Sequence, residues 1–512
     1  MKVKPYFDTV MANRLPYRLD NEDLNTGGVV SACISVMTRG SKWYGIDDGS
    51  APHGYTGKEM LPGNRGEQVR LRPSKEDADG HYHAISNGVL WAAHHRMPEK
   101  IEAYSDEARV QYDNVNRMAA DAVINRHRIM VHDYQLSLVP KMIRGGERKR
   151  WLAPLLDKKA IMYYQHIPMW DVETQEKVKE LPDHEGIERL MIDELEGMLY
   201  SDLVGFQTPL DAHMFAVLVN RNIPSTRIRE NADDSYSIEY KDHIARAEAF
   251  PISIDTDVVR DYVTGTQINF RFEDGTDLQE KLQEAKRKGH SVAAKIGRLD
   301  YTKAFEENML IAEKLSQMGL PIEYFVIAAP TRESLNAYKE ARDRTIKLAE
   351  DINRRNYERL GYNLIFFRNE SIPFGESTLC LMRDCDIYLD ASKIDGKHLT
   401  PEEATEAKAV LPYKERGIIV IGANTGTGWQ HSAGGFGPED GLVIINPEDI
   451  EKSAVGIMHT IRGGYNVSDI LIDFRRNHNV TKWIYDIEES MEKARKTNAK
   501  SILTIAGRHS FQ

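Results

Sequence analysis

The chain has 512 residues, of which 41% are hydrophobic and 28% are charged, and its formal net charge is −11 at pH 7. This length exceeds what one hydrophobic core usually serves, so we expect two domains, and the negative charge argues against a general nucleic-acid binder, which needs a basic surface. Three cysteines (Cys33, Cys380 and Cys385) are too few for a disulfide framework and match no zinc spacing, so a reducing cytoplasm is the simplest setting.

The first residues are interrupted by charge throughout, so no apolar signal core is expected there. The most apolar stretches, such as residues 417–422, are far shorter than the roughly 20 residues that a membrane span requires. We therefore expect a protein with no membrane partner.

Short apolar runs alternate with amphipathic helices along the first half of the chain. The helical pattern of residues 108–123 is followed by an apolar run at 129–131, and the runs at 160–164 and 203–206 flank a helix at 187–199. This alternation is typical of parallel sheets with helices on both faces.

The second half repeats the scheme after a boundary expected near residues 250–255, where Pro251 makes a turn. The glycine-rich segment 424–441 is predicted to be a long loop. Ligands of such sheets bind at the carboxyl ends of the strands, so two domains face to face would hold a ligand in the cleft between them. The predicted strands of this half lie at 292–296, 322–327, 364–367, 387–389, 418–421 and 442–445, and its helices at 305–318, at 333–360, from 401 and from 447.

A glycine pair, Gly27 and Gly28, precedes an apolar helix in the first half. Without side chains, the backbone N–H groups can approach an anion, which the helix N-terminus also favours. The alternative is that the pair simply makes a turn.

Two cations, Arg298 and Lys303, follow the strand that opens the second half. At a strand end they can straddle a diphosphate, the arginine through its fork and the lysine as a point charge. A solvated surface pair is the alternative reading.

The segment DGKHLTPEE at 395–403 combines a turn with a helix start. Thr400 and Pro401 are typical of a helix N-terminus, which by itself explains the carboxylates of Glu402 and Glu403. The functional interpretation is a loop whose backbone amides meet a diphosphate while a carboxylate accepts from ribose hydroxyls.

Aromatic and polar residues gather in two segments of the first half. Tyr82 and Trp91 could frame a sugar face and Asp133 could bind its hydroxyls, although core packing is the usual fate of such aromatics. His166 follows an apolar run and is either a structural histidine or a polar group directed at a ligand.

Metal, serine and cysteine chemistry find little support. Asp384 and Asp386 resemble a metal-binding pair, but they lie where a helix runs into a strand and are better interpreted as a helix end. The sequence contains no Gly-x-Ser-x-Gly elbow and no His-Glu-x-x-His motif. No metal and no cofactor are therefore predicted.

Taken in order, these segments resemble the trehalose-6-phosphate synthase family of retaining glycosyltransferases. The matching segments span nearly the whole chain, and the steps from Tyr82 to Trp91 and from Arg298 to Lys303 both fit the family pattern. The matches are ANR at 12–14, GG at 27–28, WYG at 43–45, YHAISNGVLW at 82–91, HDYQL at 132–136, HIP at 166–168, DLVGFQT at 202–208, PISID at 251–255, GRLDYTK at 297–303, APTR at 329–332, DG at 395–396, Glu403 and INPEDI at 445–450.

The resemblance implies an α/β chain of the GT-B class, with two Rossmann-like domains facing each other across a cleft. Residues 1–252 would form the acceptor-binding domain and residues 253–478 the nucleotide-sugar-binding domain. Residues 479–512 would form a helix that crosses back to the N-terminal domain. A homo-oligomer is compatible with these observations, and the sequence does not determine the oligomeric state.

The family's site residues can be carried over wherever this sequence matches. The resemblance implies catalytic roles for Arg298, Lys303, His166 and Asp395. Donor binding would involve Gly28, Arg298, Lys303, Lys397, His398, Leu399, Thr400 and Glu403, and acceptor binding would involve Arg14, Trp43, Tyr82, Trp91, Asp133 and Arg332.

The implied reaction moves a hexosyl group from a nucleoside-diphosphate sugar to a sugar phosphate with retention of configuration and without metal. The acceptor hydroxyl attacks from the face that the diphosphate leaves, and a leaving phosphate oxygen takes the proton. The main requirement is then to stabilise charge on the leaving group, which preorganised cations and amides do well, and no glycosidase-like carboxylate pair is needed.

This sequence departs from the family mainly on the donor side, where the usual DGMNLVAKE is DGKHLTPEE. Lys397 and His398 therefore stand where donor contacts are made.

The leading hypothesis is α,α-trehalose-6-phosphate synthase. The alternatives are a pseudo-glycosyltransferase that couples a nucleoside-diphosphate cyclitol to a phosphorylated aminocyclitol, a glucosylglycerol-phosphate synthase, and a non-catalytic regulatory homologue that binds sugar phosphates. The sequence leaves the donor base, donor sugar and acceptor open.

Overall fold

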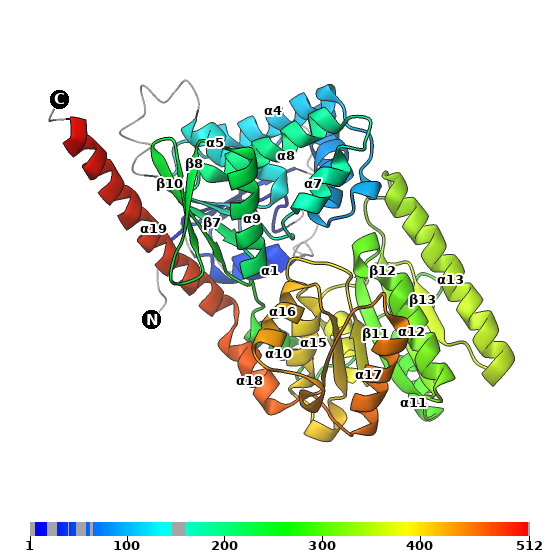
Figure 1. The fold of residues 1–512 in the computed structure, drawn as a ribbon. Coiled ribbons are helices and arrows are strands. Elements are labelled where there is room, and N and C mark those ends of the chain that lie inside the picture. Colours follow the sequence, from blue (N-terminus) through cyan, green and yellow to red (C-terminus); the bar gives the residue numbers. More distant parts are fainter. Residues whose placement is uncertain are drawn as a thin grey trace. The chain divides into compact units, whose positions relative to one another are not determined.

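The computed structural model of the protein describes residues 6–17, 28–38, 40–47, 58–61, 65–145 and 159–509. The chain divides into two units (Figure 1). Unit 1 comprises Met1–Ile252 and Val480–Gln512, and unit 2 comprises Ser253–Asn479. Among the described residues, no helix combines the length and the apolar character that a membrane crossing requires.

Unit 1 is built on a ten-stranded sheet with the order β3-β4-β2-β1-β5-β6-β7-β10-β9-β8. The stretch from β4 to β10 is parallel, whereas β3 and the β8–β9–β10 ribbon pair in antiparallel fashion. The strands are β1 (Thr9–Met11), β2 (Lys42–Ile46), β3 (Lys58–Met60), β4 (Glu67–Leu71), β5 (Arg128–His132), β6 (Ala160–Tyr164), β7 (Leu203–Phe206), β8 (Thr226–Glu230), β9 (Tyr236–Tyr240) and β10 (His243–Ala249).

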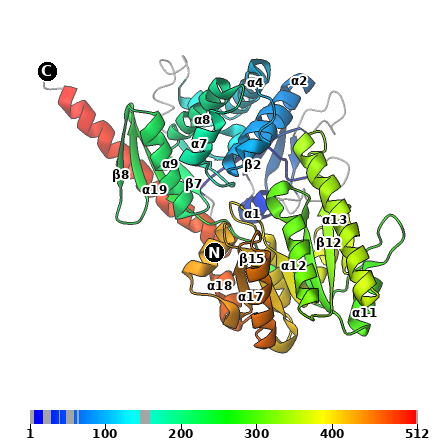
Figure 2. The same ribbon diagram turned by 45° about the vertical axis from the view of Figure 1, so that its right-hand side comes forward.

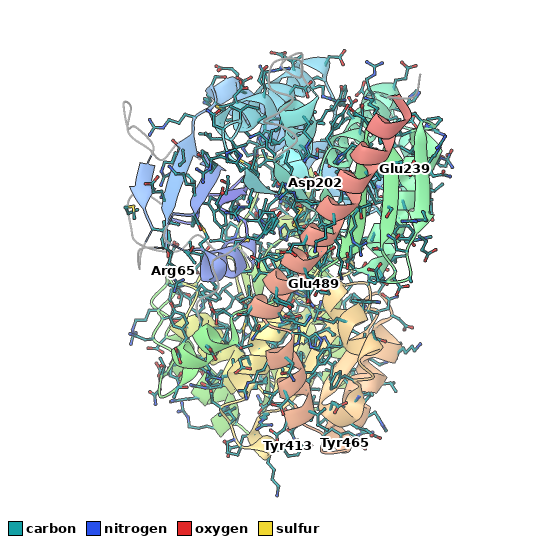
Figure 3. The ribbon with its side chains drawn as sticks, turned by 90° about the vertical axis from the view of Figure 1, so that its left-hand side faces the viewer. Arg65, Asp202, Glu239, Tyr413, Tyr465 and Glu489 are labelled. Carbon is teal, nitrogen blue, oxygen red and sulfur yellow. The ribbon has the colours of Figure 1, made fainter. Side chains whose placement is uncertain are left out.

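Helices surround this sheet, and the last helix of the chain, α19, packs against β6, β7 and β10 of the same unit (Figure 3). Trp483 of α19 donates its indole N–H to the Tyr164 hydroxyl at 3.4 Å, which ties the helix to the end of β6. The helical segments are α1 (Gly28–Val36), α2 (Lys75–Asp79), η2 (Gly80–Leu90), α3 (Trp91–His94), η3 (Pro98–Lys100), α4 (Asp106–Ala122), η4 (Tyr134–Leu136), α5 (Val139–Arg144), α7 (Val172–Val178), α8 (His184–Leu199), α9 (Pro209–Asn222) and α19 (Val480–His509).

Unit 2 contains a six-stranded, fully parallel sheet with the order β13-β12-β11-β14-β15-β16. In chain order this is 3-2-1-4-5-6, the order of a Rossmann sheet. Its strands are β11 (Ser291–Arg298), β12 (Ile322–Ala329), β13 (Ile365–Arg368), β14 (Ile387–Asp390), β15 (Ile418–Gly422) and β16 (Leu442–Ile445).

Helices bury both faces of the second sheet. Successive residues of a strand point to opposite faces, so neighbouring residues belong to different clusters. In β11, Ala293 joins the cluster covered by α12, α13 and α17, three helices that are labelled in Figure 2. Val292 and Ala294 join the cluster covered by α10, α11, α14, α15 and α18. The helical segments are α10 (Thr256–Val263), α11 (Leu278–Arg287), η5 (Tyr301–Lys303), α12 (Phe305–Gln317), α13 (Asn336–Leu360), α14 (Glu376–Asp384), α15 (Thr400–Lys408), η6 (Tyr413–Glu415), α16 (Gly426–Ala433), η7 (Pro438–Asp440), α17 (Ile450–Arg462) and α18 (Asp469–Asn477).

The prediction of parallel α/β sheets is confirmed, and so are the helix end at Asp384 and the helix start at Thr400. The prediction of a long loop at 424–441 is wrong, because helix α16 and the short turn η7 occupy much of it. Thr425 caps α16 by accepting from the N–H of Gly428 at 2.9 Å. Glycines at 426 and 428 lower the helix propensity that a sequence pattern detects, and the cap together with tertiary contacts outweighs this deficit.

Candidate functional site

In unit 2 the predicted cations lie at the point where the strand order reverses. β11 and β14 are neighbours in the sheet, and the chain leaves them in opposite directions. Arg298 is the last residue of β11, and Lys303 lies in the turn η5 directly after it. The loop after β14 brings Asp395 to Lys303, and the two side chains form an ion pair. Lys303 and Asp395, which are distant in sequence, thus meet where Rossmann sheets bind ligands, and Arg298 ends the strand that leads to this point.

The loop at residues 395–399 presents its backbone in a specific orientation. The carbonyls of Gly396 and Lys397 accept from the N–H groups of Gly426 and Thr427, each at 3.0 Å, at the start of α16. The N–H groups of Lys397, His398 and Leu399 donate to no partner among the described residues. Consecutive N–H donors just ahead of α15 form a concavity suited to an anion.

The side chains of Lys397 and His398 point into unit 2. Lys397 is 2% exposed and its Nζ lies 2.7 Å from Glu402 Oε1, and it also donates to Gln430. Burial lowers the pKa of Lys397 to about 8. Both residues were predicted to bind the donor. In this structure their side chains are turned inward, and their backbone N–H groups are the groups that a ligand can reach.

His398 belongs to a buried network around Asp390, the last residue of β14. Its Nε2 lies 3.2 Å from Asp390 Oδ2, which also accepts from the Thr400 hydroxyl at 2.7 Å. The ammonium of Lys295 pairs with the other carboxylate oxygen of Asp390. With φ at 63°, His398 adopts a left-handed conformation that this network holds in place.

A second carboxylate, Glu403, is available to a ligand. It is 7% exposed, and its carboxylate accepts no hydrogen bond from any described residue. Burial, together with the neighbouring charges of Glu402 and Asp390, raises the pKa of Glu403 to about 7. A buried carboxylate without a partner is poised to accept from a ligand hydroxyl.

Sequence reasoning missed the buried partners of this loop. Glu402 was interpreted only as a helix-start residue, yet it pairs with Lys397 and with the fully buried Arg475 of α18. Arg475 lies more than 70 positions away, and no pattern in the sequence connects the two. Asp390 was detectable in principle, since it directly follows a predicted strand.

Arg332 follows β12 in the same unit, with φ at 49°. Its side chain is 4% exposed, lies 3.2 Å from Asp300 Oδ2 and also donates to the Tyr338 hydroxyl. The guanidinium is therefore held in a fixed position by a buried carboxylate and a phenol.

In unit 1 the strand order reverses between β1 and β5, which are adjacent in the sheet. Arg14 follows β1 and is exposed, and its guanidinium lies 3.5 Å from the Tyr82 hydroxyl. Trp43 is fully buried and donates its indole N–H to the carbonyl of Arg14 at 2.8 Å. Gly28 is the first residue of helix α1, as expected, while Gly27 lies outside the described residues.

Tyr82 lies in a π-helix, η2, which ends one residue before Trp91 and changes which residues share a face. Its hydrogen bonds span five residues, as in the bond from the Trp91 N–H to the Ser86 carbonyl. Nine residues make two and a half turns of an α-helix, at 3.6 per turn, but roughly two turns of a π-helix. The π-helix therefore brings Tyr82 and Trp91 to the same face, where an α-helix would place them on opposite ones.

Two side chains in this segment satisfy the carbonyls of the π-helix. The Ser86 hydroxyl donates to the His81 carbonyl at 2.6 Å, and the Asn87 amide donates to the Tyr82 carbonyl at 2.7 Å. The Tyr134 hydroxyl in turn donates to the Asn87 side chain at 2.9 Å. This hydrogen bonding fixes the unusual helix at the position of Tyr82.

Asp133 and His166 are joined at the carboxyl ends of β5 and β6. The N–H of His166 donates to Asp133 Oδ1 at 3.2 Å, and Asp133 is held at φ 74°. Desolvation raises the pKa of Asp133 to about 6. The His166 ring is buried against His132, and burial lowers its pKa well below the usual value. The backbone N–H groups of His166 and Tyr134 both hydrogen-bond to the Asp133 carboxylate, while the imidazole of His166 is held inside unit 1.

Metal chemistry gains no support from the part of the chain that the structure describes. No group of three or more histidine, cysteine, aspartate and glutamate side chains there could hold a metal ion. The three cysteines are buried thiols, and burial raises the pKa of Cys33 above its usual value. What the arrangement offers is cations, oriented amides and carboxylates, which suit phosphate and sugar binding.

Comparisons with known proteins agree with this arrangement. The model of glycosyltransferase family 20 matches residues 12–467. The chain is 26% identical over 474 residues to the UDP-forming α,α-trehalose-phosphate synthase of Candida albicans, covering 88% of this chain and 89% of that protein. It is 27% identical over 487 residues to the trehalose-6-phosphate synthase of Mycobacterium avium, covering 90% and 88%.

Among solved structures, the chain resembles a UDP-forming α,α-trehalose-phosphate synthase from Burkholderia xenovorans in complex with glucose 6-phosphate. The TM-score is 0.74 at 20% identity, covering 94% of this chain and 99% of that one. An Escherichia coli structure with bound UDP-2-fluoroglucose gives a TM-score of 0.73 at 21% identity, covering 94% and 98%. The GT-B fold class expected from the sequence is confirmed by this likeness.

Proposed function

Because the chain belongs to glycosyltransferase family 20, we propose that it is an α,α-trehalose-6-phosphate synthase that transfers glucose from UDP-glucose to glucose 6-phosphate with retention. The choice of UDP and of a phosphorylated acceptor follows the relatives, which are UDP-forming enzymes or have been seen with glucose 6-phosphate. The observation that carries the proposal is the set of three loop amides, those of Lys397, His398 and Leu399, that have no partner among the described residues. They belong to the loop that pairs with Lys303 through Asp395, at the strand reversal of unit 2.

The donor diphosphate is proposed to bind the N–H groups of Lys397, His398 and Leu399 together with Arg298 and Lys303. As the bond between the sugar C1 and the diphosphate oxygen breaks, negative charge moves onto that oxygen, and preorganised donors stabilise it without reorganising. Lys303 is already oriented by its ion pair with Asp395. Asp395 contacts the donor sugar in this proposal, because its carboxylate lies beside the diphosphate-binding lysine.

The remaining donor contacts follow from the start of α15. Glu403, buried and without a partner among the described residues, accepts from a ribose hydroxyl in this proposal. Thr400 contributes through its position as the first residue of α15, since the N-terminus of a helix favours an anion. Gly28, as the first residue of α1, offers a second such terminus to the diphosphate.

The acceptor phosphate is proposed to bind Arg14 and Tyr82, with Arg332 as the residue of unit 2 in the same role. Trp91 and Asp133 contact the acceptor sugar in this proposal. Trp91, the first residue of α3, does so from the face that it shares with Tyr82 of the π-helix. Trp43 acts indirectly in this proposal, since its full burial and its bond to the Arg14 carbonyl make it a support for Arg14. His166 likewise acts by holding Asp133 through its backbone N–H.

The reaction in this proposal requires no general base from the protein. The acceptor hydroxyl bonds to C1 on the face that the diphosphate leaves, and its proton passes to the leaving phosphate oxygen. Residues of this chain position the two substrates and stabilise the leaving group, which is why the proposal includes independence from divalent metal. Both substrates are phosphates that do not cross membranes unaided, so a cytoplasmic location is proposed as well.

A donor-by-acceptor screen tests this function. UDP-, GDP- and ADP-glucose are each combined with glucose 6-phosphate, glucose and glycerol 3-phosphate, and free nucleoside diphosphate is measured. We expect release of UDP with glucose 6-phosphate and little with unphosphorylated glucose. Preference for glycerol 3-phosphate would favour a glucosylglycerol-phosphate synthase. The absence of turnover in every combination, with sugar phosphates still bound, would favour a regulatory homologue.

A further inference from the structure

Helix α16 begins against the loop that carries the unpartnered amides. The N–H of Gly426 donates to the Gly396 carbonyl and the N–H of Thr427 to the Lys397 carbonyl, each at 3.0 Å. The Thr427 hydroxyl lies within hydrogen-bond reach of the Lys397 carbonyl and of the His398 carbonyl, the latter at 2.8 Å. Three successive loop carbonyls are therefore directed at the first turn of α16.

The close approach requires glycine at the helix start. A Cβ on Gly426 would lie 2.1 Å from the Gly396 carbonyl oxygen, which is closer than real Cβ atoms come. Thr427, the next residue, is 1% exposed and packs its hydroxyl against the same loop. The helix and the loop are thus fitted to each other backbone against backbone.

Planar trans peptides convert this contact into an orientation of the loop N–H groups. In a trans peptide the C=O of one residue and the N–H of the next point in opposite directions, and the described chain contains no cis peptide bond. The three carbonyls held by α16 belong to Gly396, Lys397 and His398. Their peptide partners are the N–H groups of Lys397, His398 and Leu399, the same three that have no partner among the described residues.

We propose that the first turn of α16 positions the donor-binding loop, with Thr427 as its central positioning residue. This inference rests on the proposed function, because it assigns the three amides to the donor diphosphate. By holding three carbonyls, the helix start directs three N–H groups away from itself. It also polarises the peptides, since a hydrogen bond to a carbonyl makes the attached N–H a better donor.

Two side-chain contacts add to the backbone contact between the loop and α16. Lys397 donates to Gln430 on the next turn of α16, and the Thr427 hydroxyl lies 3.5 Å from Glu402 Oε1 on α15. Lys397 therefore acts from inside the unit, as a tie between the loop and α16. This tie explains why a lysine stands at position 397, where the sequence departs from the family, without a contact between its ammonium and the diphosphate.

The test uses Thr427→Val, which keeps the shape of the side chain and removes the hydroxyl, and Thr427→Ser, which keeps the hydroxyl. Thr345→Val in α13 is a matched control, because Thr345 is also buried and its hydroxyl also donates to a backbone carbonyl, that of Ala341 at 2.7 Å. UDP affinity is measured by calorimetry, and kcat and both KM values by release of UDP from UDP-glucose.

We expect Thr427→Val to weaken UDP binding and to lower kcat by roughly one to two orders of magnitude. The acceptor KM should stay unchanged, Thr427→Ser should restore most of the activity, and Thr345→Val should resemble the wild type. Wild-type UDP affinity and kcat in a folded Thr427→Val variant would overturn the inference. If the valine variant does not fold, Thr427→Ala replaces it and is judged by the same two criteria. A wild-type protein that neither binds nor releases any of UDP, GDP and ADP would instead overturn the proposed function.

Discussion

The imidazoles of His132 and His166 lie 2.8 Å apart, from Nδ1 of the first to Nε2 of the second, in the interior of unit 1. Gln207 sets the direction of this contact. Its side-chain oxygen accepts from the backbone N–H of Ile252 at 2.9 Å, so its amide nitrogen must be the group that donates to His166 Nδ1 at 3.3 Å. His166 therefore carries its proton on Nε2 and donates it to His132. Both nitrogens of its ring are then in use inside the protein, and no ring nitrogen is left for a substrate.

We expect the paired histidines to make unit 1 sensitive to acid. Burial lowers the pKa of His132 to about 3 and that of His166 well below 6.5. In the window from about 6.5 down to these values, the unfolded chain binds protons that the folded chain does not. The free energy of unfolding should therefore fall with decreasing pH, by about 1.4 kcal/mol per unit for each group. Urea unfolding at pH 6.5 and 5.5 measures the slope, and His132→Phe should reduce it. An equal slope in the variant would contradict the assignment.

Arg298→Ala and Lys303→Ala should each lower kcat by roughly two or more orders of magnitude, as expected for losing a preorganised electrostatic donor. Their contacts strengthen as charge develops on the leaving diphosphate, and interactions gained in the transition state appear in kcat. Arg354→Ala, an exposed change in α13, serves as the control. Weaker donor affinity with kcat unchanged in both variants would refute their role in the chemistry and leave the fold assignment standing.

Donor affinity should increase as the pH rises through 7. Burial raises the pKa of Glu403 to about 7, and a ribose hydroxyl donates better to the ionised carboxylate. Below this pKa the group must first lose its proton, so the dissociation constant of UDP should increase up to about tenfold per pH unit. Glu403→Gln should raise the donor KM more than it lowers kcat, and it should abolish this pH dependence. Calorimetric titrations with UDP at pH 6, 7 and 8 measure the effect, and an unchanged profile in the variant would assign the titration to another group.

Arg14 and Arg332 are both proposed to bind the acceptor phosphate, but we expect only the loss of Arg332 to lower Tm as well. Arg14 is exposed, so Arg14→Ala should raise the acceptor KM about tenfold or more while leaving Tm unchanged. Arg332 neutralises the buried Asp300, so Arg332→Ala should weaken acceptor use and also lower Tm, because a buried carboxylate loses its cation. Kinetics with glucose 6-phosphate, combined with thermal unfolding, separate the two effects. Equal use of unphosphorylated glucose by the wild type would contradict both assignments.

Turnover should persist in a chelator. The proposed leaving-group stabilisation comes from Arg298, Lys303 and three amides, so EDTA should leave kcat within about twofold of its value in buffer, a change too small to represent a lost electrostatic donor. The assay is run with and without added magnesium or manganese. Full loss of activity in EDTA, restored by either ion, would show that the diphosphate needs a metal after all.

The residue pattern alone predicts the class of fold, which the comparisons confirm, and it proposes the segments that carry chemistry. Apolar runs such as 129–131 and 387–389 identify buried strands because a strand covered on both faces must be apolar throughout. Arg298 and Lys303 stand out because they follow such a strand and so fall at the ligand-binding edge of the sheet. Family motifs added residue roles that periodicity cannot provide.

The tertiary structure decided which groups meet and which way they point. Asp395 pairs with Lys303 because two strands distant in sequence are neighbours in the sheet, and Lys397 turns inward because Glu402 and Gln430 satisfy it there. The π-helix at Tyr82 and the helix at Gly426 were hidden from the sequence, since both depend on contacts with other segments more than on local propensity. Burial, hydrogen-bond direction and peptide orientation are properties of the folded chain, and they determine which of the predicted residues act through a side chain and which through the backbone.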